Sequence, residues 1–180
     1  IQHAPFRECL RWTGVTGNIE VDCMAELPSS VGLGTSSSFV VGALNTLYAF
    51  QGRVVHPLDL AYQAIEIERD VLHESVGCQD QTFAAMGGFN LIEFRSTRDI
   101  IVHRIPLTPE RQKEFEEHLM LVYTGIRRRA STVAARQVRN IDRNSERLKR
   151  IRRLVDESHS ILVGGSSLAP FGRLLHESWI

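Results

Sequence analysis

The chain has 180 residues, of which 43% are hydrophobic and 23% are charged, so it can bury a core and is not disordered as a whole. Lys+Arg and Asp+Glu both number 21, so no overall charge attracts the chain to nucleic acid or to an anionic membrane. Three separated cysteines without a CxxC spacing argue against a disulfide scaffold and a zinc site, and they predict a reducing, cytoplasmic environment.

The first predicted element is a strand. Residues 19–27 alternate apolar and polar side chains, which is typical of a half-buried strand. Residues 14–18 read as a turn, and residues 8–12 are a candidate partner strand before that turn. We therefore expect the chain to open with a β-hairpin.

A Gly/Ser loop over residues 28–38 separates this strand from a run of helices. Apolar residues at helical spacing predict a helix over 39–48 that stops near Gly52. A second helix is expected to begin at Pro57, because proline suits the first turn, and to end near residues 75–77.

The second half mixes strands with helices. The expected elements are a short helix over 80–85, strands over 89–94 and 100–105, a helix over 109–117, a strand over 119–123, a long helix over 130–157 and a final helix over 168–180. Strands and helices in mixed order indicate the α+β class.

The Gly/Ser loop is the first candidate functional motif. Glycines let the backbone approach a ligand closely, and free N–H groups at a helix start attract phosphate. The loop lacks the lysine of a Walker A motif, and a serine-rich helix cap explains it about as well. The candidate phosphate-binding residues are Gly32, Leu33, Gly34, Thr35, Ser36 and Ser37.

Two carboxylates are further candidates. Glu68 lies near the apolar stripe of the helix that begins at Pro57, so it is expected on the inward side, where it needs a cation or a hydrogen-bond partner. A magnesium ion or a salt bridge to an arginine would serve. Asp80, between the amides Gln79 and Gln81, is a candidate general base or simply a helix cap.

Together these segments resemble the GHMP-type small-molecule kinases. The family's Gly-Leu-Gly-Ser-Ser motif corresponds to residues 28–38, and its Gly-x-x-Asp-Gln segment corresponds to residues 77–81. Within the family, the chain is most similar to the D-glycero-D-manno-heptose 7-phosphate kinases. The supporting stretches are residues 76–81, 87–90, 123–131 and 171–179.

The resemblance implies a fold and a reaction. The fold would be the GHMP kinase fold, with a ribosomal protein S5 domain 2-like N-terminal lobe over residues 1–110 and the start of a C-terminal α/β lobe over 111–180. The reaction would be ATP-dependent phosphorylation of the anomeric hydroxyl of a sugar phosphate. ATP and Mg²⁺ would be the cofactors.

The resemblance also implies roles for single residues. Asp80 would accept the proton of the sugar hydroxyl, and Ser36 and Glu68 would hold magnesium. Arginine suits the distal phosphate of such a sugar, because its guanidinium pairs with phosphate oxygens. The candidate substrate-binding residues are Gly77, Gln79, Asp80, Thr124, Gly125 and Arg128.

The chain lacks two motifs that the family is expected to carry, one near each end. The first family motif and the third, glycine-rich motif have no counterpart here. The chain is therefore expected to be a fragment of a larger kinase, possessing little activity by itself.

Three alternatives stay open. One is a galactokinase-like or fucokinase-like sugar 1-kinase, and another is a non-catalytic sugar or nucleotide sensor on the same fold. The third is nucleic-acid binding by residues 127–153, which hold eleven basic residues against Asp142 and Glu146. No aromatic residues interleave with these arginines, so we expect small-molecule partners, with neither nucleic acid nor membrane.

Overall fold

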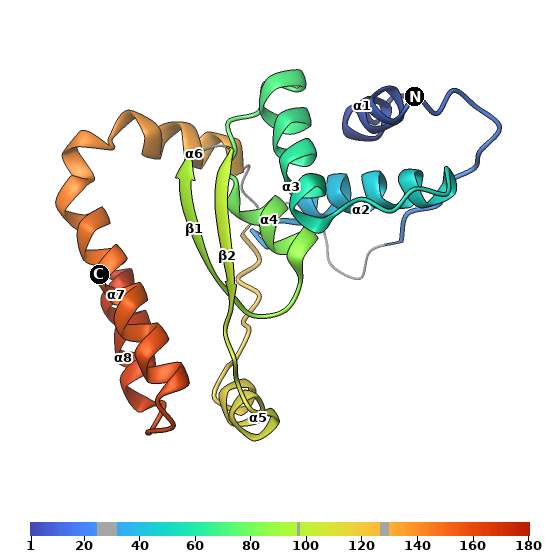
Figure 1. Cartoon of the computed structure of the whole chain (residues 1–180). Coiled ribbons are helices and arrows are strands. Elements are labelled where there is room, and N and C mark those ends of the chain that lie inside the picture. The colour runs from blue at the N-terminus through green and yellow to red at the C-terminus, as the bar shows by residue number, and fades with distance from the viewer. Residues whose placement is uncertain (25–31, 97, 127–129) are drawn as a thin grey trace. The chain divides into compact units, whose positions relative to one another are not determined.

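The computed structural model describes residues 1–24, 32–96, 98–126 and 130–180 (Figure 1). They fold into helices and one two-stranded sheet, which confirms the predicted α+β class. The chain divides into two compact units. Unit 1 consists of Ile1–Gly88, Ser96–Arg98 and Thr124–Val138, and unit 2 consists of Phe89–Arg95, Asp99–Tyr123 and Arg139–Ile180.

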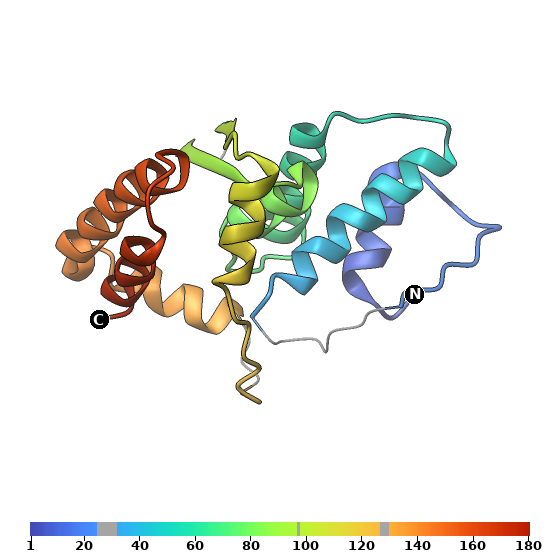
Figure 2. The ribbon, with the colours of Figure 1, turned by 90° about the horizontal axis from the view of Figure 1, so that it is seen from below.

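Unit 1 is built mainly from helices that share one apolar core. They are α1 (Ala4–Thr13), α2 (Thr35–Phe50), α3 (Pro57–Glu66), the π-helical turn η1 (Ile67–Val71) and α4 (Gln79–Met86). Figure 2 shows α1 lying alongside α2. The buried core residues are Cys9, Val40, Val41, Leu44, Leu47, Tyr48, Leu60, Ala64 and Ile67. Because a fully buried aliphatic side chain contributes about 1.5–3 kcal/mol, this core can hold the helices together.

The predicted strand at residues 8–12 is wrong, because these residues lie within α1. The His3 side chain accepts a hydrogen bond from the Phe6 N–H at the helix start, and Pro5 occupies the first turn. At the other end, Gly14 adopts a left-handed conformation with φ of +74°, which is typical of a helix C-cap. Local capping therefore decides for a helix here.

The predicted strand at 19–27 is also wrong over residues 19–24, which have no regular secondary structure; residues 25–27 lie outside the described part of the chain. Only Ile19 packs against the core, while Val21 and Cys23 are exposed. Residues 119–123, likewise expected as a strand, have no regular structure and are exposed. A strand needs a neighbour for its backbone hydrogen bonds, and among the described residues neither segment is placed in a sheet.

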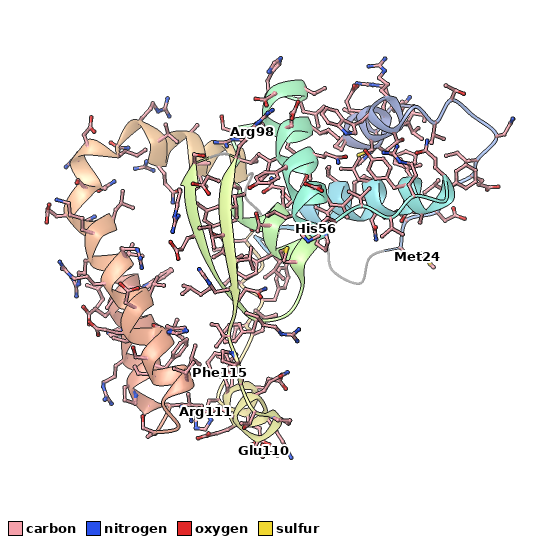
Figure 3. All side chains as sticks on the ribbon, viewed as in Figure 1. Met24, His56, Arg98, Glu110, Arg111 and Phe115 are labelled. Atoms are coloured by element: carbon pink, nitrogen blue, oxygen red, sulfur yellow. The ribbon has the colours of Figure 1, made fainter. Side chains whose placement is uncertain are left out.

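Unit 2 holds the β-hairpin, with β1 (Asn90–Ser96) and β2 (Asp99–Arg104) close to the predicted positions. Its helices are α5 (Pro109–Glu117), α7 (Ser145–Val163) and α8 (Ala169–Trp179). The core gathers around Ile105, Leu162 and Leu168. Phe115 of α5, labelled in Figure 3, stacks on Phe89 and meets Phe171 edge-to-face. These contacts join the hairpin, α5 and the α7–α8 pair into one unit.

The long helix predicted over 130–157 is wrong as a single element. It is two helices, α6 (Ala130–Arg139) and α7, separated by the short 3-10 turn η2 (Asp142–Asn144). The N–H of Asn144 donates to the carbonyls of Asn140 and Ile141, which tightens the chain at this point. Asn and Asp compete with helical hydrogen bonding, so the break falls where they cluster.

The remaining helices agree with prediction within a few residues, except that the helix beginning at Pro57 ends as a π-helical turn at Val71 and not near residues 75–77. Thr108 caps α5 by accepting from the N–H of Arg111, and proline stands in the first turn of α3, α5 and α8. In the described part of the chain, no helix combines the length and the apolar character that crossing a membrane requires.

Candidate active site

The candidate phosphate loop leads directly into α2. Gly34 occupies the N-cap position with φ of +68°, a left-handed conformation that glycine adopts without strain, and the Ser38 N–H donates to the Gly34 carbonyl over 2.9 Å. No described side chain caps this helix start. Its first N–H groups are therefore available to an anion, which the helix dipole also favours.

Glu68 lies on the π-helical turn that follows α3. The Leu72 N–H donates to the Ile67 carbonyl over 2.9 Å, and the Glu74 N–H donates to the Glu68 carbonyl over 2.8 Å. Such wide turns often occur at functional sites, because they redirect one side chain relative to the rest of a helix. Glu68 is 3% exposed, so it points inward as its spacing predicted.

Two neutral donors from different helices hold the Glu68 carboxylate. The Ser37 hydroxyl on α2 lies 3.1 Å from Oε1 and 2.9 Å from Oε2, so its single O–H donates to this carboxylate. The Gln81 side-chain N–H on α4 donates to Oε2. Ser37 is 4% exposed and Gln81 is 1% exposed. The partners of this buried acid are thus a hydroxyl and an amide, and the arginine salt bridge considered from the sequence is not what pairs it.

Burial is the main influence on the protonation of Glu68. It raises the pKa of this carboxyl above the ordinary 4.5, while the hydrogen bonds from Gln81 and Ser37 lower it. The negative charges of Asp80 and Glu74 raise the pKa further. A bound cation would offset the cost of burying the charged carboxylate, and it would also reduce the repulsion by Asp80 and Glu74.

Asp80 lies against the backbone of the phosphate loop. A Cβ atom added to Gly34 would stand 2.9 Å from the Asp80 Cγ and 3.2 Å from its Oδ1. Asp80 is in the first turn of α4 and is exposed to solvent, so a substrate can reach its carboxylate. The candidate base therefore lies at the helix start where a phosphate would bind.

The structure gathers four of the sequence-predicted site residues in unit 1: Gly34, Ser37, Glu68 and Asp80. Gly32 has φ of +84°, Thr35 is half-buried, and Leu33 and Ser36 are exposed. The hydroxyl that reaches Glu68 is that of Ser37, whereas the sequence resemblance assigned Ser36 as the partner of Glu68 at a metal ion.

The predicted substrate-binding residues lie in separate segments of the chain, and only some of them are near Asp80. Gly77 and Gln79 are exposed where α4 begins, next to Asp80. Thr124 and Gly125 lie beyond the irregular segment 119–123, and the Thr124 hydroxyl accepts a 3.4 Å hydrogen bond from the Ile126 N–H. Arg128 lies outside the described residues.

Gln81 is a site residue that its sequence position alone does not indicate. In the sequence it stands as an amide beside Asp80, yet it is almost fully buried and binds Glu68 directly. The available signal was its position inside the same motif as Asp80, one residue further along α4.

The donor set suits magnesium only as part of a nucleotide complex. Within the described residues, no group of three or more His, Cys, Asp or Glu side chains could hold a metal ion. Mg²⁺ commonly uses one or two protein carboxylates, with substrate phosphates and waters completing its shell. Glu68, with the hydroxyls at the start of α2, fits that pattern of hard oxygen ligands.

Comparison with known proteins supports the resemblance seen in the sequence motifs. Residues 5–88 match the family described as "GHMP kinases N terminal domain". The chain is 34% identical over 109 residues to D-glycero-alpha-D-manno-heptose 7-phosphate kinase of Campylobacter jejuni, a match that covers 61% of this chain and 32% of that protein.

A second curated relative is L-fucokinase/L-fucose-1-P guanylyltransferase of Bacteroides fragilis, 29% identical over 189 residues. That match covers 99% of this chain and 19% of the relative, so the chain corresponds to a minor part of either protein. No solved structure matches the chain. The motif resemblance is thus confirmed: residues 5–88, which carry Gly34, Glu68 and Asp80, match the N-terminal domain of the GHMP kinases.

Proposed function

We propose that this protein is an ATP-dependent sugar kinase whose acceptor is a sugar hydroxyl. The observation that carries the proposal is the approach of Asp80 to Gly34, at a helix start that is open to phosphate. Beside it, the buried carboxylate of Glu68 accepts hydrogen bonds from Ser37 and Gln81. Phosphoryl transfer depends mainly on positioning and charge stabilisation, and this arrangement supplies both.

The proposed reaction uses Asp80 as the general base. Its carboxylate accepts the proton of the sugar hydroxyl, whose oxygen forms a bond to the γ-phosphorus as the bond from that phosphorus to the ADP oxygen breaks. The ATP phosphates would lie on the helix start, cradled by Gly32, Leu33, Gly34, Thr35, Ser36 and Ser37.

Glu68 is the proposed protein carboxylate for Mg²⁺, with Ser36 or Ser37 contributing a hydroxyl. A bound magnesium ion would neutralise charge on the β- and γ-phosphates. Glu68 itself keeps one fixed orientation through its hydrogen bonds to Ser37 and Gln81, so it needs no rearrangement when the nucleotide complex arrives.

D-glycero-D-manno-heptose 7-phosphate is the substrate we propose first, with phosphate added at the anomeric hydroxyl. The support is the heptose 7-phosphate kinase relative and the motif resemblance. Gly77, Gln79, Thr124, Gly125 and Arg128 are the proposed substrate-binding residues, and the guanidinium of Arg128 would meet the 7-phosphate. We also propose the division into lobes at residues 1–110 and 111–180.

A free sugar is the second candidate substrate. The match to the fucokinase relative runs over 99% of this chain, a longer stretch than the match to the heptose kinase. L-Fucose has no distal phosphate, so its recognition would not need a phosphate-binding arginine. The two candidates therefore differ in their dependence on Arg128.

The test is a coupled ADP-release assay on the full-length protein with Mg·ATP and, in turn, heptose 7-phosphate, galactose and L-fucose. We expect turnover with heptose 7-phosphate that falls by at least about 10²-fold in Asp80→Asn, because the base is lost. Turnover only with a free sugar would exclude the heptose assignment. An Asp80→Asn rate equal to the unmutated rate would exclude the base assignment, and ATP binding without any turnover would favour a sensor.

A further inference from the structure

The side chain of Gln81 connects two parts of unit 1 that the proposed reaction uses. Its N–H donates to the Glu68 carboxylate on η1, and its backbone belongs to the first turn of α4, immediately after Asp80. Ser37, on the first turn of α2, donates to the same carboxylate. Glu68 therefore joins the starts of α2 and α4 at one buried point.

Only one end of the Gln81 amide is hydrogen-bonded within the described residues. Its Oε1 is buried without a partner among the described residues. Turning the amide over would place this oxygen, an acceptor, against the carboxylate oxygen, which also accepts. The amide thus serves Glu68 while leaving its own carbonyl unsatisfied, an arrangement that is unfavourable for the stability of the fold alone.

The same turn of α4 is held from a second direction. Asp80 lies against Gly34, and Gly34 begins α2, the helix that also carries Ser37. Ser37 and Gln81 therefore hold Glu68 by hydrogen bonds, while Asp80 is held by its close approach to the Gly34 backbone. If either donor were lost, the buried carboxylate could rotate, and the first turn of α4 would lose a tie to η1.

We propose that Gln81 and Ser37 are positioning residues, which fix the Glu68 carboxylate in place and, through the first turn of α4, fix Asp80 relative to it. The functional meaning of this clamp rests on the proposed kinase function. The structural coupling between residues 37, 68 and 81 does not depend on the proposed kinase function. Gln81 is given no direct contact with the reacting atoms, and for Ser37, already proposed beside the ATP phosphates, the positioning role is an additional one.

The structural test is a mutant cycle read by amide hydrogen exchange in the full-length protein. Gln81→Met keeps an unbranched side chain of similar length but removes the donor. We expect exchange in the first turn of α4 to become at least about tenfold faster, because this turn can then open locally. In a Glu68→Met background the acceptor is gone, so adding Gln81→Met should change this exchange by less than about twofold.

The matched control is Thr13→Val. Thr13 is also a buried polar residue of unit 1, but its hydroxyl donates to the Cys9 and Leu10 carbonyls and does not touch Glu68. It should leave exchange in α4 unchanged. Equal effects of Gln81→Met with Glu or Met at position 68, or no effect with either, would overturn the clamp. If Gln81→Met does not fold, Ser37→Ala replaces it in the same cycle and is expected to accelerate exchange at the start of α2.

The functional test measures kcat and KM for ATP with an accepted sugar. We expect Gln81→Met to lower kcat by about 10–100-fold with a smaller change in KM, because it disturbs positioning more than binding, and Thr13→Val to change neither. If Gln81→Met changes the exchange pattern but the protein phosphorylates no sugar, the clamp is supported and the proposed kinase function is contradicted. If the protein is an active kinase and Gln81→Met leaves its kcat unchanged, the positioning role of Gln81 is contradicted.

Discussion

Gly34 and Asp80 approach so closely that a single added methyl group at Gly34 would stand 2.9 Å from the Asp80 side chain. The two residues are separated in sequence by α2, α3 and η1, and they come together because α2 and α4 pack on the same core. This approach brings a candidate base to a helix start that can bind phosphate.

Gly34→Ala is expected to destabilise the fold by about 1–2 kcal/mol, because alanine is strained at φ of +68°, and also to push Asp80 out of place. Gly52→Ala is the matched control: its φ is +72°, yet nothing lies within 4 Å of the added Cβ. Urea unfolding should show similar losses for both variants. Only Gly34→Ala should also abolish phosphoryl transfer. Equal activities of Gly34→Ala and Gly52→Ala would show that the close contact between Gly34 and Asp80 does not matter for activity.

Glu68→Gln is expected to stabilise the protein at neutral pH in the absence of nucleotide. Burial raises the pKa of Glu68, so the folded state holds its proton more tightly than the unfolded state does. Stability therefore falls as pH rises from about 4.5 through the raised pKa, and the neutral amide removes this loss. Thermal unfolding from pH 4 to pH 8 should show the two proteins diverging as pH rises. A variant less stable than the parent at pH 7 would mean that the donated hydrogen bonds outweigh burial.

The three cysteines should differ in reactivity because they differ in burial. Burial, aided by the negative charges of Glu68 and Glu8, raises the pKa of Cys9 to about 12, and the thiolate is the reactive form. Cys23 is exposed. With an aromatic disulfide reagent at pH 8, Cys23 should react at once and Cys9 only after unfolding in urea, with Cys9→Ala identifying its signal.

The same pKa shift sets a second, alkaline limit. The unfolded thiol ionises near 9, whereas the folded one keeps its proton to about 12, so the unfolded state is favoured progressively as pH rises above 9. Cys9→Ala should lose less stability between pH 9 and pH 11 than the parent. Labelling of native Cys9 as fast as Cys23 would contradict both expectations.

Arg111, labelled in Figure 3, is expected to be a main stabiliser of unit 2. It reaches from α5 to the end of α7, where it donates to the Ile161 carbonyl over 2.8 Å and to the Leu162 carbonyl over 3.2 Å. Its side chain is 10% exposed. Arg111→Met leaves two helix-end carbonyls unpaired and should reduce the free energy of unfolding by about 2–4 kcal/mol.

Lys113→Met provides the comparison on the same helix. Its ammonium lies 3.9 Å from the Glu117 carboxylate and both side chains are largely exposed, so its removal should change stability by less than about 0.5 kcal/mol. Urea denaturation followed by circular dichroism measures both variants. Equal, small effects would show that solvent satisfies the α7 carbonyls as well as Arg111 does.

Most helices and the β-hairpin could be predicted from the sequence, because the signals that define them are local. Pro57 and Pro109 stand in first turns, and a two-residue connection joins β1 to β2. The inward position of Glu68 also followed from its place on an apolar stripe. These features depend on residues within one or two turns of each other, so they need no knowledge of distant segments.

The sequence by itself thus determined most of the helices, the hairpin and the motif residues of a GHMP kinase N-terminal domain, whereas only the tertiary structure decided how those residues meet. It paired the Ser37 hydroxyl with Glu68, added Gln81 and set Asp80 against Gly34. It also left the alternating residues 19–24 without regular structure, since a strand forms only where a neighbour accepts and donates its hydrogen bonds. Contacts between segments far apart in the chain depend on how whole helices pack, and no local pattern records that packing.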